Sequence, residues 1–321
     1  MNRIEARLSS AVFPSPILFE DKVICFLKKF LTGQFNIESK LISFSNENFK
    51  IREFSGNVWV LRIPNNISHC LCHQQQERAV LDWASQERFS ILEVRGYDEQ
   101  EGYLLTRFLT GKSCSAIDFQ NPLNLREAIE ILHRLHTSKT APIESVFDPL
   151  ERYVVTSQEA MQEGISFAPE IHKISYQLKN FLLQIPRDRF QQVLCHNDPS
   201  PENFFRQDGY LYLHDWELAR CNDPMWDLAH FSVIGQVNLE KILCFYSTSD
   251  LFAKEKILFF QAFIFFNTLV WAAFESEKPR SSFPKESVVM LYQTFLEKIN
   301  ALIKSTPFET ALKKLLKEQI I

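Results

Sequence analysis

The segment from His196 to Asn203 reads His-Asn-Asp-Pro-Ser-Pro-Glu-Asn and combines side chains that can support phosphoryl transfer. Within it, Asp198 precedes Asn203 by five positions, and Asp215 follows Asn203 by twelve. Phosphoryl transfer needs a carboxylate beside the attacking hydroxyl and oxygen ligands for Mg²⁺, all held rigidly. The spacing therefore predicts that Asp198 orients or deprotonates a hydroxyl, and that Asn203 and Asp215 bind Mg²⁺.

Each of these residues also has a simpler structural explanation. Asp198 stands before Pro199 and could form a turn, Asn203 could cap a helix, and Asp215 could end a strand. The joint spacing, preceded by a region rich in strand signals, favours the phosphotransferase interpretation over three independent structural roles.

A second pair lies upstream. Arg62 falls on a predicted strand and Glu77 on the helix that follows it, so the two could form an ion pair that holds the nucleotide phosphates. The alternative is that Arg62 is an exposed strand residue and Glu77 a solvated helix residue.

The chain has only 8 glycines, and the loop at 43–48 has none. In this loop we expect Ser45 to donate to a phosphate, while Glu47 adds negative charge.

The hydrophobic pattern divides the chain near residue 110. Before it, helices are predicted at 19–31 and 73–86, and strands at 41–44, 49–54, 58–63, 90–95 and 103–108, with Gly96 and Gly102 in the loop between the last two. After it the pattern is mostly helical, at 125–136, 171–183 and 227–321, interrupted by a hairpin around Asp208-Gly209. This predicts an α+β fold with two lobes and a cleft at their junction.

The segments CHNDPSPENFF and LHDWELARCNDPMWDLAHF resemble the choline/ethanolamine kinase and aminoglycoside phosphotransferase superfamily of kinase-like small-molecule kinases. The resemblance covers roughly residues 40–275. It implies a bilobal protein-kinase-like fold that uses ATP and Mg²⁺, with an N-lobe at 1–108, a hinge at 109–112 and a C-lobe at 113–321. It also implies that Arg62 contacts phosphate with Glu77 as its partner, and that a strand ending in Arg107, Phe108 and Leu109 holds adenine through its backbone.

The acceptor is expected to be a small alcohol. The chain has no Asp-Phe-Gly or Ala-Pro-Glu motif, and the short segment between Asp215 and Asp227 leaves no room for an activation loop. An acceptor would therefore bind in a pocket of the C-lobe rather than on a peptide platform.

A cationic alcohol would need aromatic faces and a carboxylate. The candidates are Trp216, Glu217, Trp226 and Trp271, although core packing is the alternative in a chain with 29 phenylalanines. Choline kinases resembling this chain carry a second tryptophan one turn before the position of Trp271, where Thr268 stands here. Choline, ethanolamine, thiamine and other amino alcohols therefore stay open, as do an aminoglycoside-type antibiotic kinase and a catalytically silent kinase-like binding module.

The 321-residue composition excludes several other classes. A net charge of −4 provides no basic field for nucleic acid. Seven scattered cysteines and an N-terminus without a signal-peptide pattern favour a cytoplasmic protein with reduced thiols. Residues 69–73 resemble half a zinc site without a second pair of ligands. The uncharged stretch at 257–274 reaches the lower limit of a membrane span, but we expect it to be a buried central helix. The oligomeric state stays open.

Overall fold

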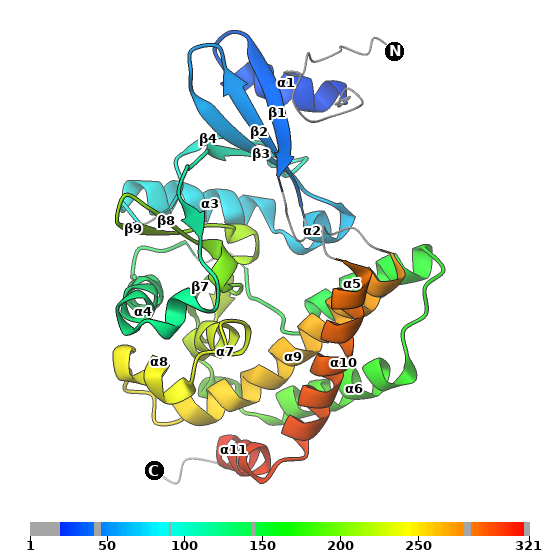
Figure 1. The fold of residues 1–321 in the computed structure, drawn as a ribbon. Helices are drawn as coiled ribbons and strands as arrows, with labels where there is room; N and C mark the ends of the chain where they lie inside the picture. The colour runs from blue at the N-terminus through cyan, green and yellow to red at the C-terminus, as the bar shows by residue number, and fades with distance from the viewer. Residues whose placement is uncertain (1–19, 42–45, 90, 143–144, 279–283, 318–321) are drawn as a thin grey trace.

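The computed structural model describes residues 20–41, 46–89, 91–142, 145–278 and 284–317. The chain forms an antiparallel sheet region followed by a larger helical region, which confirms the predicted α+β architecture (Figure 1). The predicted strand at 41–44 falls largely outside the described residues, and Ser45 falls wholly outside them.

The N-terminal region is a five-stranded sheet with helices packed against it. The strand order is β1-β2-β3-β5-β4, and the members are β1 Phe35–Leu41, β2 Glu47–Glu53, β3 Val58–Ile63, β4 Val94–Tyr97 and β5 Leu104–Arg107. The accompanying helices are α1 Asp21–Phe30, α2 Asn66–Leu71 and α3 Gln74–Gln86. All strand pairs in this sheet are antiparallel, and the order departs from a meander only because β5, rather than β4, lies beside β3.

Alternation along β3 gives the sheet two different faces. Trp59 and Leu61 pack with α1 in a small apolar core, whereas Val60 and Arg62 line a cavity on the opposite side. A buried basic side chain at the end of an apolar strand is thereby directed toward the helical region.

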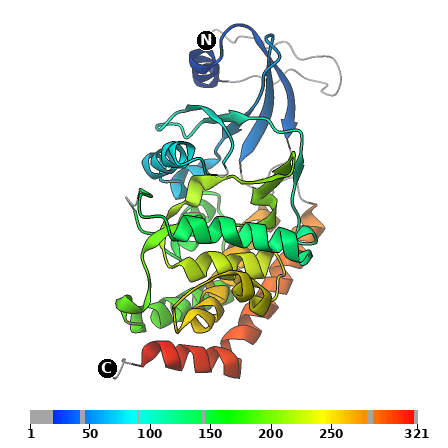
Figure 2. The same ribbon diagram turned by 90° about the vertical axis from the view of Figure 1, so that its left-hand side faces the viewer.

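The helical region lies below the sheet in Figure 1, and Figure 2 shows the same stacking from the side. Its helices are α4 Pro122–His136, α5 Glu151–Gln162, α6 Pro169–Gln184, α7 Pro224–Ile234, α8 Leu239–Phe245, α9 Ala253–Glu277, α10 Lys285–Ile303 and α11 Thr306–Leu316. Its short strands are β6 Lys112–Ser113, β7 Val193–Cys195, β8 Phe204–Gln207, β9 Tyr210–Leu213 and β10 Arg220–Asn222.

The connection between the two regions is attached to the helical side. The backbone N–H groups of Thr110 and Gly111 donate to the side chain of Gln207, at 2.7 and 3.3 Å, and β6 then pairs with β8. A Cβ atom at Gly111 would lie 2.0 Å from the carbonyl oxygen of Arg206, so this close approach requires glycine.

The apolar stretch at 257–274 forms most of α9, which packs against α5, α7, α10 and α11. Within the described residues, α9 is the one helix whose length and composition would allow it to cross a membrane, yet about 67% of its most apolar window is buried inside the protein. The expectation of a central core helix is therefore confirmed, and many of the phenylalanines serve this core.

Most element predictions hold, and the exceptions have identifiable causes. The strand at 58–63, the helix at 73–86 and the hairpin of β8 and β9 are confirmed. The strand at 90–95 is wrong, because β4 begins at Val94 and includes Gly96, which was expected in a loop. The ring of Phe30 lies where a Cβ of Gly96 would be, so tertiary packing of α1 explains this glycine. Helix α5 was not predicted.

Lys256 provides a test of the core around α9. Its ammonium is buried and lies 2.8 Å from Asp223 and 2.6 Å from Asp250. Lys256→Ala should lower the free energy of unfolding by about 3–5 kcal/mol, because two buried carboxylates lose their counter-charge. Urea denaturation measures this. The control is Lys254, which lies on α9 like Lys256 but forms an exposed ion pair with Glu240 of α8. Lys254→Ala should cost less than about 1 kcal/mol. Equal costs for the two variants would contradict the prediction.

Candidate active site

A cavity of about 880 Å³ lies between the sheet and the helical region. Both regions contribute to its wall. Val60, Arg62 and Thr106 line it from the sheet, and Asp198, Asn203 and Asp215 line it from the helical side. The residues predicted to act in catalysis therefore line the same cavity as the strands predicted to bind the nucleotide.

The loop that carries Asp198 is held by a single buried carboxylate. The backbone N–H groups of His196 and Asn197 donate to the two oxygens of Asp227, each at 2.8 Å. Asn197 has a left-handed backbone with φ 65°, and its side chain donates to the carbonyl of Leu218 at 2.8 Å. The chain consequently reverses after β7 and projects the next residue, Asp198, into the cavity.

Asp198 is fixed through one of its two oxygens. Its Oδ1 accepts a hydrogen bond from Ser200 Oγ at 2.8 Å and lies 3.2 Å from Nε2 of His230. The side chain stays 30% exposed toward the cavity. These contacts leave Oδ2 as the oxygen that can meet an incoming hydroxyl.

Asn203 is oriented by the same loop. Its Nδ2 donates to the backbone oxygen of Asp198 at 2.8 Å, which leaves the amide oxygen as the atom suited to a cation. The backbone N–H of His214 donates to the carbonyl of Asn203 at 2.9 Å, and so ties the loop to the end of the β8–β9 hairpin.

Asp215 follows this hairpin in a left-handed conformation, with φ 66°. Its Oδ1 is buried and has no hydrogen-bond partner in the part of the chain that the structure describes, and it lies 3.6 Å from the guanidinium of Arg62. Burial, together with the charges of Glu217 and Asp198, raises the pKa of Asp215 well above its usual value despite Arg62. A buried carboxylate oxygen without a donor fits a divalent cation.

Arg62 and Glu77 form the predicted pair. Two parallel contacts of 2.7 Å join the guanidinium to the carboxylate, and both side chains are buried. Burial would raise the pKa of Glu77, but the charge and hydrogen bonds of Arg62, with the hydroxyl of Tyr97 at 2.5 Å, hold it below its usual value. These contacts fix the guanidinium of Arg62, and its Nη1 atom also lies 3.6 Å from Asp215 and 3.7 Å from Glu217.

The three residues predicted to hold adenine all lie at the cavity, but the side chain of the first is engaged by other residues of the sheet region. Arg107, Phe108 and Leu109 all line the cavity. The Arg107 side chain bonds to Glu93 and stacks on the ring of Trp59, and the backbone N–H of Phe108 donates to Val58 at 3.0 Å. Their role toward adenine stays a prediction.

The three predicted tryptophans, Trp216, Trp226 and Trp271, all line the cavity, but they differ in burial. Trp216 and Trp226 are only 2% and 1% exposed, and their ring N–H groups donate to backbone oxygens of Leu213 and Asn197. Their burial in the core weighs against a cation on either ring face. The carboxylate of Glu217 accepts a hydrogen bond from Asn46 at 2.8 Å and lies 3.7 Å from the guanidinium of Arg62.

Trp271 differs from these two tryptophans. It lines the cavity from α9, beside Thr268 and opposite residues of α10. Of the predicted aromatic residues, it is therefore the one whose position at the cavity is not explained by deep burial in the core.

The cavity residues that sequence reasoning missed include Asn46, Arg152 and His230. His230 follows the matched segment Asp227-Leu228-Ala229 directly, so its position in that motif was a usable signal. Arg152 belongs to a helix that was not predicted, and nothing in its local sequence distinguishes it.

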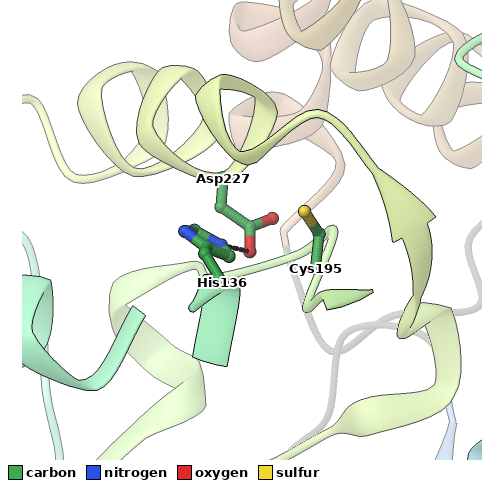
Figure 3. Close-up of side chains that lie close together, drawn as sticks. All are labelled: His136, Cys195 and Asp227. Carbon is green, nitrogen blue, oxygen red and sulfur yellow. Dashed lines mark hydrogen bonds and ion pairs between the residues drawn. The ribbon is translucent and has the colours of Figure 1, made fainter. Parts of the chain in front are cut away.

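A buried cluster of His136, Cys195 and Asp227 has the residue types of a metal site (Figure 3). However, both ring nitrogens of His136 are used, at 2.9 Å to the Tyr246 hydroxyl and 2.9 Å to Asp227. Burial also raises the pKa of the Cys195 thiol well above its usual value. In this structure the cluster supports the loop that carries Asp198, because Asp227 accepts from two backbone N–H groups of that loop.

Comparison with known proteins agrees with this geometry. Residues 40–241 match the model of the phosphotransferase enzyme family, and the chain belongs to that family. This confirms the superfamily that the sequence motifs indicated.

Individual relatives are similar in sequence and fold. Protein LicA of Haemophilus influenzae is 29% identical over 208 residues, which cover 63% of this chain and 59% of LicA, so the match spans about six-tenths of that relative. A solved structure of LicA in complex with AMP aligns with a TM-score of 0.71 and 19% identity, over 88% of this chain and 98% of that chain. The choline kinase LicA from Streptococcus pneumoniae aligns with a TM-score of 0.68 and 19% identity, over 87% and 98%. The kinase-like bilobal fold is thereby confirmed.

The loop support at Asp227 leads to a stability prediction. Asp227→Asn should lower the free energy of unfolding by about 3 kcal/mol, because one backbone N–H of the loop would then face an amide donor. Cys195→Ala, in the same cluster, should cost about 1 kcal/mol. Urea denaturation with and without EDTA measures both. A metal site would instead show a clear loss of stability on chelation, and similar losses for the two variants.

Proposed function

We propose that this protein transfers the γ-phosphoryl group of ATP, with Mg²⁺, to the hydroxyl of a small cationic alcohol of the choline, ethanolamine or thiamine type. The observation that carries this proposal is the convergence of Asp198, Asn203 and Asp215 in one cavity, facing the locked guanidinium of Arg62. The family membership and the similarity to LicA, including a LicA structure that holds AMP and a LicA described as a choline kinase, support it.

The donor atoms fit the proposed cation. The amide oxygen of Asn203 and the carboxylate of Asp215 would hold Mg²⁺, and the unpaired buried oxygen of Asp215 is the contact that supports this. Bound there, Mg²⁺ would neutralise charge on the β- and γ-phosphates.

The chain's own groups supply the remaining chemistry. Asp198 Oδ2 would accept the proton of the acceptor hydroxyl, while Ser200 and His230 hold Oδ1. Burial lowers the pKa of His230, so its ring is neutral near pH 7 and can donate from Nε2 to the carboxylate. Arg62, which is fixed by Glu77, would contact the phosphates of the nucleotide.

The wider organisation follows the same proposal. The N-lobe at 1–108 would bind the nucleotide, with adenine against the backbone of residues 107–109 and Ser45 at a phosphate. Residues 109–112 would act as the hinge, and the C-lobe at 113–321 would hold the acceptor. A cytoplasmic location would provide both ATP and reducing conditions for the seven cysteines, none of which forms a disulfide in the described residues.

Asp198→Ala tests the proposed base. Turnover should fall by a factor on the order of 10³ or more, because proton removal and hydroxyl positioning are both lost, while ADP binding changes little. Coupled detection of ADP release and calorimetry with ADP measure the two quantities. Asp208→Ala, in the exposed turn of the β8–β9 hairpin, is the matched control and should keep full turnover. Persistent turnover in Asp198→Ala would refute this role.

An acceptor screen tests the substrate class. ATP consumption with choline, ethanolamine, thiamine and aminoglycosides should be stimulated by at least one of the three amino alcohols. Trp271→Ala should then raise the KM for that acceptor about tenfold, consistent with loss of one cation–π contact. Tyr210→Ala removes an exposed aromatic ring away from the cavity and should have no effect. Stimulation by aminoglycosides alone would identify an antibiotic kinase, and silence with every acceptor would favour a binding module.

A further inference from the structure

Arg152 is a cavity residue without an ion-pair partner in contact with it among the described residues. It stands in the first turn of α5, is half-buried and lines the cavity. In the described part of the chain its side chain has no hydrogen bond and no ion pair, whereas the other two cavity arginines that are buried, Arg62 and Arg220, are paired with Glu77 and Glu151. A guanidinium that lines a cavity without a carboxylate in contact can form two parallel hydrogen bonds to an anionic ligand.

The backbone that carries Arg152 is firmly placed. The neighbouring Glu151 lies 2.7 Å from the buried guanidinium of Arg220, which also contacts His73 at 2.9 Å. The side chain of Asn267 in α9 donates to the carbonyl of Pro149 at 3.2 Å, just before the helix begins. The start of α5 is thereby fixed to both the helical region and the N-terminal helices.

Arg152 lines the same cavity as Asp198 and Asp215, and the helix that carries it, α5, packs against α2 and α9. Burial raises the pKa of Glu217, while the charges of Arg62 and Arg152 oppose this rise. Burial lowers the pKa of His230, and Arg152 lowers it further. Glu217 lies beside Arg62, and His230 contacts Asp198. Arg152 therefore shares the cavity with Asp198 and Asp215, and its charge acts on Glu217 and His230, which lie beside them in sequence or in space.

We propose that Arg152 is a catalytic residue that binds the equatorial oxygens of the phosphoryl group as it passes from the nucleotide to the acceptor. This rests on the proposed function. In the step, the acceptor oxygen forms a bond to phosphorus, the bond from phosphorus to the ADP oxygen breaks, and the hydroxyl proton moves to Asp198. Charge on the transferred group is shared between donor and acceptor, and a planar guanidinium can contact two of its oxygens at once.

Two variants test this assignment. Arg152→Met should lower kcat about 100-fold and leave the KM for the acceptor within about threefold, because the contact is made to the transferred group. Arg152→Lys, which keeps the charge but not the fork, should recover part of the loss, and added guanidinium ion at millimolar concentration should partly rescue Arg152→Met. Arg126→Met, on the exposed face of α4, is the control and should behave like the wild type.

Nucleotide binding provides a readout that is independent of turnover. Calorimetry with Mg²⁺ should show that Arg152→Met weakens binding of AMP-PNP about tenfold and leaves ADP binding unchanged, because only AMP-PNP carries a γ-phosphoryl group. Unchanged melting temperatures establish that the variants are folded.

Each contrary result has a distinct meaning. Unchanged kcat in Arg152→Met, or equal losses for ADP and AMP-PNP, would overturn the assignment while the proposed function stands. A large rise in the acceptor KM with kcat preserved would also overturn it and would assign Arg152 to an anionic group on the acceptor. A wild-type protein without phosphoryl transfer would refute the proposed function, and the comparison of ADP with AMP-PNP would then still decide whether Arg152 contacts the γ-phosphoryl group.

Discussion

The catalytic geometry depends on the buried carboxylate of Asp227. Two consecutive backbone N–H groups, from His196 and Asn197, point at this one side chain because Asn197 adopts a left-handed conformation. Burial would raise the pKa of Asp227, but its hydrogen bonds and the neighbouring His136 and His196 hold it below the usual value, so the charge persists. A charged acceptor binds two N–H groups more strongly than a neutral one would, and this fixes where Asp198 points.

The same carboxylate connects the site to the core. Asp227 lies one turn into α7, whose N-terminus is capped by Asp223 through the N–H of Met225 at 2.9 Å. Asp223 in turn contacts Lys256 of the apolar helix α9. The loop that carries Asp198 is therefore anchored through α7 to the largest hydrophobic core. This anchoring gives a role to the one buried, paired lysine of the otherwise apolar helix α9.

Sequence-based prediction succeeded where the interacting residues are close along the chain and failed where they are far apart. Asp198, Asn203 and Asp215 meet because a short loop and hairpin bring them together, so their spacing alone was informative. The pair of Arg62 with Glu77 followed from a basic residue on a strand and an acidic residue on the next helix, whereas the proposed adenine-binding role of residues 107–109 came from family resemblance alone. The sequence could not show which of the candidate tryptophans would be buried in the core and which would be available to a ligand. In a chain rich in Phe, aromatic residues of both kinds have the same sequence pattern. Arg152 was missed because its environment is assembled from α5, α7 and the β9–β10 segment, which are distant in sequence.

The distribution of positive charge also determines how a cationic acceptor can lie. Two unit charges 4 Å apart repel by about 4 kcal/mol at an effective dielectric constant of about 20, so an ammonium group cannot rest beside the unpaired Arg152. The carboxylate of Glu217 is engaged by Asn46 and Arg62 at the other end. If the proposed cationic acceptor binds with its hydroxyl at Asp198, its cationic group would point toward the wall of α9 and α10. Trp271 lies on that wall, and Lys298 there is exposed, so that water screens its charge. Under the proposed function, the charges of the cavity would orient such an acceptor even without an enclosing aromatic cage.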